Sequence, residues 1–172
     1  NAGTTNMLRT YGKKAAALTL AGDIGKGVVA VLIAQCIAGW AQHDVSAAIS
    51  AGYVASIAAV CGHLWPIWFG FKGGKGVAVA AGAILAAQPI VLLGLVVVFF
   101  ALAFSTKVVS LSSIVAAIVY PILTCLWSLH KGYDVIITTG CAAFMGVLVI
   151  WMHRANIQRL LKGTEYKFGQ KK

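Results

Sequence analysis

The sequence predicts an all-α, polytopic integral membrane protein built as a helical bundle. Of its 172 residues, 60% are hydrophobic and only 10% are charged, with a mean hydropathy of +0.87. A soluble domain carries about 25% charged residues, so this chain has too few polar side chains to cover a globule in water. The charge is also one-sided, because 14 Lys and Arg stand against 4 Asp and Glu, a net charge of +10. This composition excludes a soluble enzyme, a disordered tail and a secreted disulfide scaffold.

Four apolar runs are each long enough to cross a bilayer as a helix. One crossing needs about 20 apolar residues, because the hydrocarbon core is about 30 Å thick. In chain order the four predicted segments are residues 15–41, 45–65, 108–129 and 135–152.

Residues 77–104 form a fifth apolar run, too long for one straight crossing and short for two. The pair Gln88-Pro89 divides it, and a proline breaks or kinks a helix because it lacks a backbone N–H. Cytoplasmic loops near a membrane are enriched in Lys and Arg. Three groups of basic residues can lie on the same side of the membrane only if this run crosses twice, or dips in and returns. They are the basic residues before residue 15, those between residues 65 and 77, and those after residue 152.

The resulting topology has about six membrane segments, the two around Gln88-Pro89 being short. We predict one membrane domain over residues 1–172, with both ends cytoplasmic and a basic cytoplasmic tail at residues 153–172. The cysteines lie inside apolar runs without metal-ligand spacing, so neither a disulfide nor a metal is expected. They are Cys36, Cys61, Cys125 and Cys141.

Three polar clusters remain, and this topology puts all of them on the cytoplasmic face. The first contains Asn1, Thr5, Asn6 and Arg9. Amides, hydroxyls and a guanidinium can hydrogen-bond a polyhydroxyl phosphate, and the planar fork of arginine suits a phosphate well. The alternative is a helix-capping turn with an arginine at the lipid headgroups.

The second cluster is the most specific, and runs from Gly62 to Gly76 with the sequence GHLWPIWFGFKGGKG. Glycines let the backbone approach a ligand closely, and the N–H groups at the start of the following helix favour an anion. The predicted phosphate-binding residues are His63, Lys72, Gly73, Gly74, Lys75 and Gly76. The spacing is not that of a Walker A loop, so no nucleotide is expected. The alternative is a glycine turn at the membrane edge with lipid-facing lysines.

The third cluster lies after the last membrane segment. Helical spacing puts His153, Asn156 and Arg159 on a shared face that can bind a substrate or move a proton, although a structural role is the alternative. Glu165, the one glutamate in the chain, lies among cations and is interpreted as an ion-pair anchor.

Asp23 and Lys26 are charges within the first membrane segment, at positions i and i+3. Ionisable side chains are costly in a membrane, so they pair with one another or line a polar cavity. A mutual pair near the cytoplasmic end is the simpler interpretation, and both residues are assigned a structural role.

Taken together, these clusters resemble one family, the bacterial acyl-phosphate:glycerol-3-phosphate acyltransferases, or PlsY family. The patterns are NAGTTNMLR at 1–9, GHLWPIWFGFKGGKGVA at 62–78 and HRANIQRLLKGTE at 153–165. The resemblance covers essentially the whole chain.

This resemblance implies a small multi-pass enzyme of the bacterial inner membrane with its active site on the cytoplasmic face. Such an enzyme moves a fatty acyl group from acyl phosphate to the 1-hydroxyl of glycerol 3-phosphate. The products are lysophosphatidic acid and phosphate, which begin phospholipid synthesis. The partners implied are the two substrates and membrane lipid, with no metal, cofactor, nucleotide or nucleic acid.

The resemblance also implies roles for individual residues. Arg9 matches an essential arginine, residues 72–76 match the loop that binds the phosphate of glycerol 3-phosphate, and Glu165 matches a structural glutamate. His153 and Asn156 match the catalytic pair of the third motif. The family's first motif begins with a Ser-Gly and is preceded by a helix, giving seven crossings. We therefore expect this chain to lack its natural start and that serine.

Chemistry from the residues alone leaves two other classes of protein open. A transporter for a phosphorylated solute would also use a cationic loop, a broken segment and an intramembrane charge pair. A structural membrane subunit would use the glycine loop only to contact lipid headgroups. The polar residues gather on one face of the membrane, which favours an enzyme over a transporter. The sequence has no obvious Ser-His-Asp set, which favours direct transfer over an acyl-enzyme.

Overall fold

A computed structural model describes residues 3–169, apart from the side chain of Arg9, and this part of the chain contains helices and no β-strand. Five helices are long and apolar enough to cross a membrane, and a sixth apolar helix is shorter. The predicted class of fold, an all-α multi-pass membrane protein, is therefore confirmed. The chain forms two compact units that divide after Pro89, and the prediction of a single domain stays a prediction.

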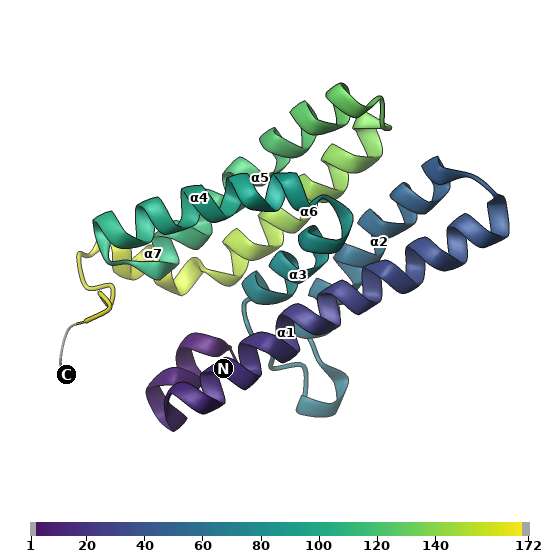
Figure 1. The fold of residues 1–172 in the computed structure, drawn as a ribbon. Helices are drawn as coiled ribbons and strands as arrows, with labels where there is room; N and C mark the ends of the chain where they lie inside the picture. The colour runs from purple at the N-terminus through teal and green to yellow at the C-terminus, as the bar shows by residue number, and fades with distance from the viewer. Residues whose placement is uncertain (1–2, 170–172) are drawn as a thin grey trace. The chain divides into compact units, whose positions relative to one another are not determined.

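The first unit contains α1 (Thr4–Gln42), α2 (Val45–Leu64), the short 3-10 helix η1 (Ile67–Phe69) and α3 (Val77–Ala87). The helix α1 begins well before the apolar run that predicted it, because hydropathy detects the oily part of a helix and not its basic start. Its first turns are separated from the rest by a break at Gly12, where φ is +83°. Figure 1 shows this break at the purple end of the chain, and α1 then runs beside both α2 and α3.

The predicted break at Gln88-Pro89 is present, and it separates α3 from α4 (Pro89–Thr106). The 11 residues of α3 give a length of about 16 Å, roughly half of a bilayer core. The break is polar, but its side chain is satisfied, because the hydroxyl of Tyr53 donates to Oε1 of Gln88 at 2.9 Å. Both side chains are buried, so this hydrogen bond ties the end of α3 to α2.

The second unit contains α4 together with α5 (Val109–Lys131), α6 (Val135–Met152) and the short α7 (Arg154–Leu161). Pro121 lies inside α5, where it cannot donate to the carbonyl of Ala117. Gly146 of α6 packs against that carbonyl, since a Cβ at Gly146 would lie 2.6 Å from the oxygen of Ala117. The two helices are also joined by a buried hydrogen bond of 2.8 Å between the hydroxyls of Ser128 and Thr138.

Candidate functional site

The first predicted cluster lies at the start of α1. Asn1 and the side chain of Arg9 are outside the described residues. Thr5 and Asn6 lie in the exposed first turn of the helix, which Gly3 precedes without a side-chain cap. The amides of Asn6 and Met7 both donate to the carbonyl of Gly3, as at an ordinary helix start.

The glycine-rich segment after α2 folds back on the end of that helix. The amide of Gly73 donates to the carbonyl of Leu64 at 3.1 Å, and the amide of Gly74 donates to the carbonyl of His63 at 3.3 Å. A Cβ at Gly73 would meet the carbonyl oxygens of both His63 and Leu64, so a larger residue has no room there. These two amides therefore hold the loop against the end of α2, and the sequence-based expectation of anion-binding N–H groups concerns the start of the next helix.

The start of α3 offers the N–H groups that the loop itself does not. Gly76 precedes the helix with φ +82°, a left-handed conformation that glycine adopts easily, and no side chain caps the first turn. Lys72 is exposed and Lys75 is half-buried in the segment before it. A helix N-terminus preceded closely in sequence by two lysines is suited to an anion.

Asp23, Lys26 and His63 form a cluster that joins α1 to α2. The ammonium of Lys26 lies 2.7 Å from Oδ1 of Asp23 and also 2.7 Å from Nδ1 of His63. Nδ1 of His63 is 3.4 Å from the same carboxylate oxygen. Asp23 and His63 are buried, whereas Lys26 is partly exposed. The expected pairing of Asp23 with Lys26 is present, and the participation of His63 is a feature that sequence reasoning missed.

The same histidine contacts the glycine loop. A Cβ at Gly74 would clash with Nε2 of the His63 ring and would lie 2.8 Å from its Cε1. The imidazole thus occupies the space that any side chain at position 74 would need. One end of the ring faces the charges on α1, and the other end faces the loop.

In the second unit, the third cluster is organised around Glu165. Nδ2 of Asn156 donates to Oε1 of Glu165 at 2.9 Å, and Nε of Arg159 donates to Oε2 at 2.8 Å. The side chain of Glu165 is only 8% exposed, so its carboxylate is held by these two donors in a nearly dry position. The carboxylate fastens the chain that follows α7 to that helix, and it orients the amide of Asn156.

His153 lies at the junction of α6 and α7 and is buried. Its Nδ1 is 2.7 Å from the carbonyl oxygen of Val149. Because a carbonyl only accepts hydrogen bonds, Nδ1 must carry a proton, and the lone pair of the neutral ring is then on Nε2. The backbone of α6 therefore fixes which nitrogen of His153 can accept a proton.

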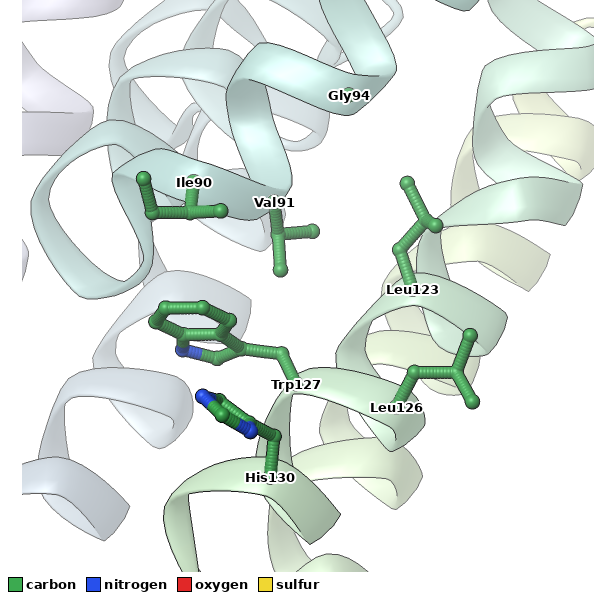
Figure 2. Close-up of a pocket in the computed structure, with 7 residues that line it drawn as sticks. All are labelled: Ile90, Val91, Gly94, Leu123, Leu126, Trp127 and His130. Carbon is green, nitrogen blue, oxygen red and sulfur yellow. The ribbon is translucent and has the colours of Figure 1, made fainter.

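A shallow apolar groove of about 250 Å³ lies between α4 and α5 of the second unit. Figure 2 shows Ile90, Val91 and Gly94 of α4 on one side, with Trp127 and His130 of α5 close together, their rings tilted by 43° to each other. The groove contains none of the residues that the sequence assigned to a site. Across residues 3–169, no group of three or more His, Cys, Asp or Glu side chains is placed to share a metal ion.

Comparison with known proteins gives a consistent result. A family model described as glycerol-3-phosphate acyltransferase matches residues 1–163. A glycerol-3-phosphate acyltransferase of Clostridioides difficile strain 630 is 47% identical over the whole chain, which covers 80% of that protein. One from Neisseria meningitidis serogroup A is 42% identical, again over the whole chain and 82% of the relative.

Two solved structures of PlsY (YgiH), an integral membrane glycerol 3-phosphate acyltransferase, are similar to this chain. One is the lysophosphatidic acid form and the other the glycerol 3-phosphate form. Each is 37% identical and superposes with a TM-score of 0.79 over 97% of this chain, and over 79% and 78% of the solved chains. The three motifs, the helical membrane fold and these similarities establish that the chain belongs to the PlsY family of glycerol-3-phosphate acyltransferases.

Proposed function

We propose that this enzyme transfers a fatty acyl group from an acyl phosphate directly to the 1-hydroxyl of glycerol 3-phosphate, releasing lysophosphatidic acid and phosphate. The reaction would take place at the cytoplasmic face of the bacterial inner membrane and begin phospholipid synthesis. The observation that carries the proposal is the segment from His63 to Gly76, a glycine loop that leads into the uncapped, basic start of α3. A related PlsY has a glycerol 3-phosphate form, which supports that substrate.

The phosphate of glycerol 3-phosphate would bind at the start of α3. The N–H groups of the first turn and the ammonium groups of Lys72 and Lys75 supply donors and positive charge there. Gly73 and Gly74 would contribute by allowing the close backbone path and not through their amides, which donate to carbonyls of α2. Asn1, Thr5, Asn6 and Arg9 are proposed to bind the polar parts of the substrates from the start of α1.

The chemical step requires little besides placement, because acyl phosphate is an activated acyl donor. The 1-hydroxyl oxygen forms a bond to the acyl carbon, the bond from that carbon to the phosphate oxygen breaks, and phosphate leaves with the electron pair. Nε2 of His153 would accept the proton of the hydroxyl, with its ring fixed by the carbonyl of Val149. Asn156, oriented by Glu165, and Arg9 would stabilise the charge that develops on the oxygens.

Positioning is the main source of rate in such a mechanism. Well-oriented reactants can lower a barrier by roughly 7–11 kcal/mol in the most favourable cases. No acyl-enzyme is needed, since the donor already carries a good leaving group. The acyl chain would remain between helices in the membrane.

The test uses the full-length protein in liposomes with radiolabelled glycerol 3-phosphate and either palmitoyl phosphate or palmitoyl coenzyme A. We expect labelled lysophosphatidic acid with palmitoyl phosphate only, together with one phosphate released per product. Product from the thioester alone would contradict the proposed donor. Unmodified label accumulating inside the vesicles would favour the transporter. A protein that becomes acylated by palmitoyl phosphate without glycerol 3-phosphate would contradict direct transfer.

Two variants test the catalytic assignments. Arg9→Ala and His153→Ala are expected to lower kcat by about 100-fold or more, because each removes a group that acts in the transition state. Both proteins should insert and melt like the wild type in detergent. Loss of folded protein would instead indicate a structural role for that residue.

A further inference from the structure

The ion cluster inside the first unit has a feature that phosphate binding by the loop does not explain. Asp23 and Lys26 are charged residues of a membrane helix, and such residues are costly to bury, pair with one another and often mark functional sites. They converge on one nitrogen of His63, while the other end of that ring lies against Gly74.

We infer that Lys26 and Asp23 are positioning residues that keep the proton of His63 on Nε2, where the ring donates a hydrogen bond to the phosphate bound at the start of α3. The inference rests on the proposed function, because the anion is taken to be the phosphate of glycerol 3-phosphate. It adds two residues of α1 to the machinery that recognises this substrate, and it gives His63 a defined protonation.

The contact with Lys26 decides where the proton of His63 lies. A lysine ammonium has only donors, so a nitrogen 2.7 Å from it must accept. Nδ1 of His63 is therefore the acceptor, since its contact with Oδ1 of Asp23 is much longer, at 3.4 Å, and the neutral ring carries its proton on Nε2. Asp23 accepts a second proton of the same ammonium at 2.7 Å, which holds the lysine over the ring and balances its charge.

The contact with Gly74 places the Nε2 end of the His63 ring at the glycine loop. The atoms of His63 nearest to a Cβ at Gly74 are Nε2 and Cε1, so the Nε2 edge lies on the bare face of the glycine. The backbone keeps this arrangement, because the amide of Gly74 donates to the carbonyl of His63 itself. Loop and ring are thus fastened together, and the donor lies within the segment that leads to the start of α3.

The experiment exploits the different reach of two amide side chains. In His63→Gln the amide nitrogen can reach the place of Nε2, whereas in His63→Asn it reaches only the place of Nδ1. We expect His63→Asn to raise the KM for glycerol 3-phosphate by about 10- to 100-fold, the value of a hydrogen bond to a charged group. His63→Gln should stay within about threefold of the wild type, and the KM for palmitoyl phosphate should not change in either variant.

Lys26→Met tests the positioning residue, with Lys14→Met as the matched control, because Lys14 is an exposed lysine of the same helix. Lys26→Met is expected to raise the KM for glycerol 3-phosphate by about tenfold with kcat nearly unchanged, and Lys14→Met to change neither. Equal KM values for the Gln and Asn variants, a parallel rise of both KM values, or equal behaviour of the two Lys variants would overturn the inference. If Lys26→Met does not fold, the comparison of His63→Gln with His63→Asn tests the inference.

Failure of the proposed function would give a different result from failure of this inference. In that case the wild type itself would make no lysophosphatidic acid. The inference would then be judged by the rise in melting temperature that glycerol 3-phosphate causes. That rise should be present in the wild type and His63→Gln and smaller in His63→Asn and Lys26→Met, and equal rises in all four proteins would overturn it.

Discussion

The close packing of α1 on α3 gives the sharpest quantitative prediction, because it depends on a glycine with a matched neighbour. A Cβ at Gly27 would lie 2.8 Å from the backbone nitrogen of Ala83 and closer still to the carbonyl oxygen of Val79. A Cβ at Gly25, two residues earlier on the same helix, would meet nothing within 4 Å. Gly27→Ala and Gly25→Ala therefore make the same chemical change in two different surroundings.

The magnitude follows from the geometry. Ordinary van der Waals contact begins at about 3.4 Å, so Gly27→Ala must move α3 away from α1 by more than half an ångström. Backbone atoms cannot rotate aside, and overpacking of this kind costs about 1–3 kcal/mol. Gly25→Ala meets no obstacle and is expected to add up to about 1 kcal/mol of helix stability. Because the start of α3 is the proposed phosphate site, Gly27→Ala should also raise the KM for glycerol 3-phosphate.

The assay is unfolding of each purified variant in mixed micelles with increasing dodecyl sulfate, which gives the difference in the free energy of unfolding. Steady-state kinetics with both substrates then separate an effect on KM from one on kcat. We expect Gly27→Ala to be less stable than Gly25→Ala by about 1–3 kcal/mol, the cost of overpacking, because the gain in helix propensity is common to both variants and cancels. Equal stabilities would refute the close packing of α1 on α3.

Three further changes test separate parts of the chain. Gly74→Ala should raise the KM for glycerol 3-phosphate more than that for acyl phosphate, because the new methyl group displaces the ring of His63, and equal changes in steady-state kinetics would count against the loop assignment. Glu165→Ala should lower the melting temperature, because it removes the acceptor of two hydrogen bonds. Glu165→Gln keeps one acceptor oxygen, so its melting temperature in thermal unfolding should lie between those of Glu165→Ala and the wild type. Thr138→Val should lower the free energy of unfolding in the micelle assay by about 0.6–1.7 kcal/mol, because it removes the hydrogen bond to Ser128. Thr139→Val should leave that free energy unchanged, because within the described residues the buried hydroxyl of Thr139 has no hydrogen-bond partner.

Much of the fold could be predicted because hydropathy is a local property. The segment at 135–152 is reproduced to the residue by α6, and the second begins at Val45 as expected. The short α3 was predicted as well, because Gln88 and Pro89 interrupt the apolar run at residues 77–104. Only the hydrogen bond between Tyr53 and Gln88 shows how a polar break is accommodated there.

The sequence by itself determined the membrane class, the three polar clusters and the family resemblance, because composition, spacing and motif are read along the chain. The tertiary structure decided which groups meet. It placed His63 on Lys26, 37 positions away in sequence, and it directed the amides of Gly73 and Gly74 to carbonyls of α2. The physical reason is that hydrogen-bond partners depend on how helices pack, and the packing of α1 against α2 and α3 leaves no signature in local spacing.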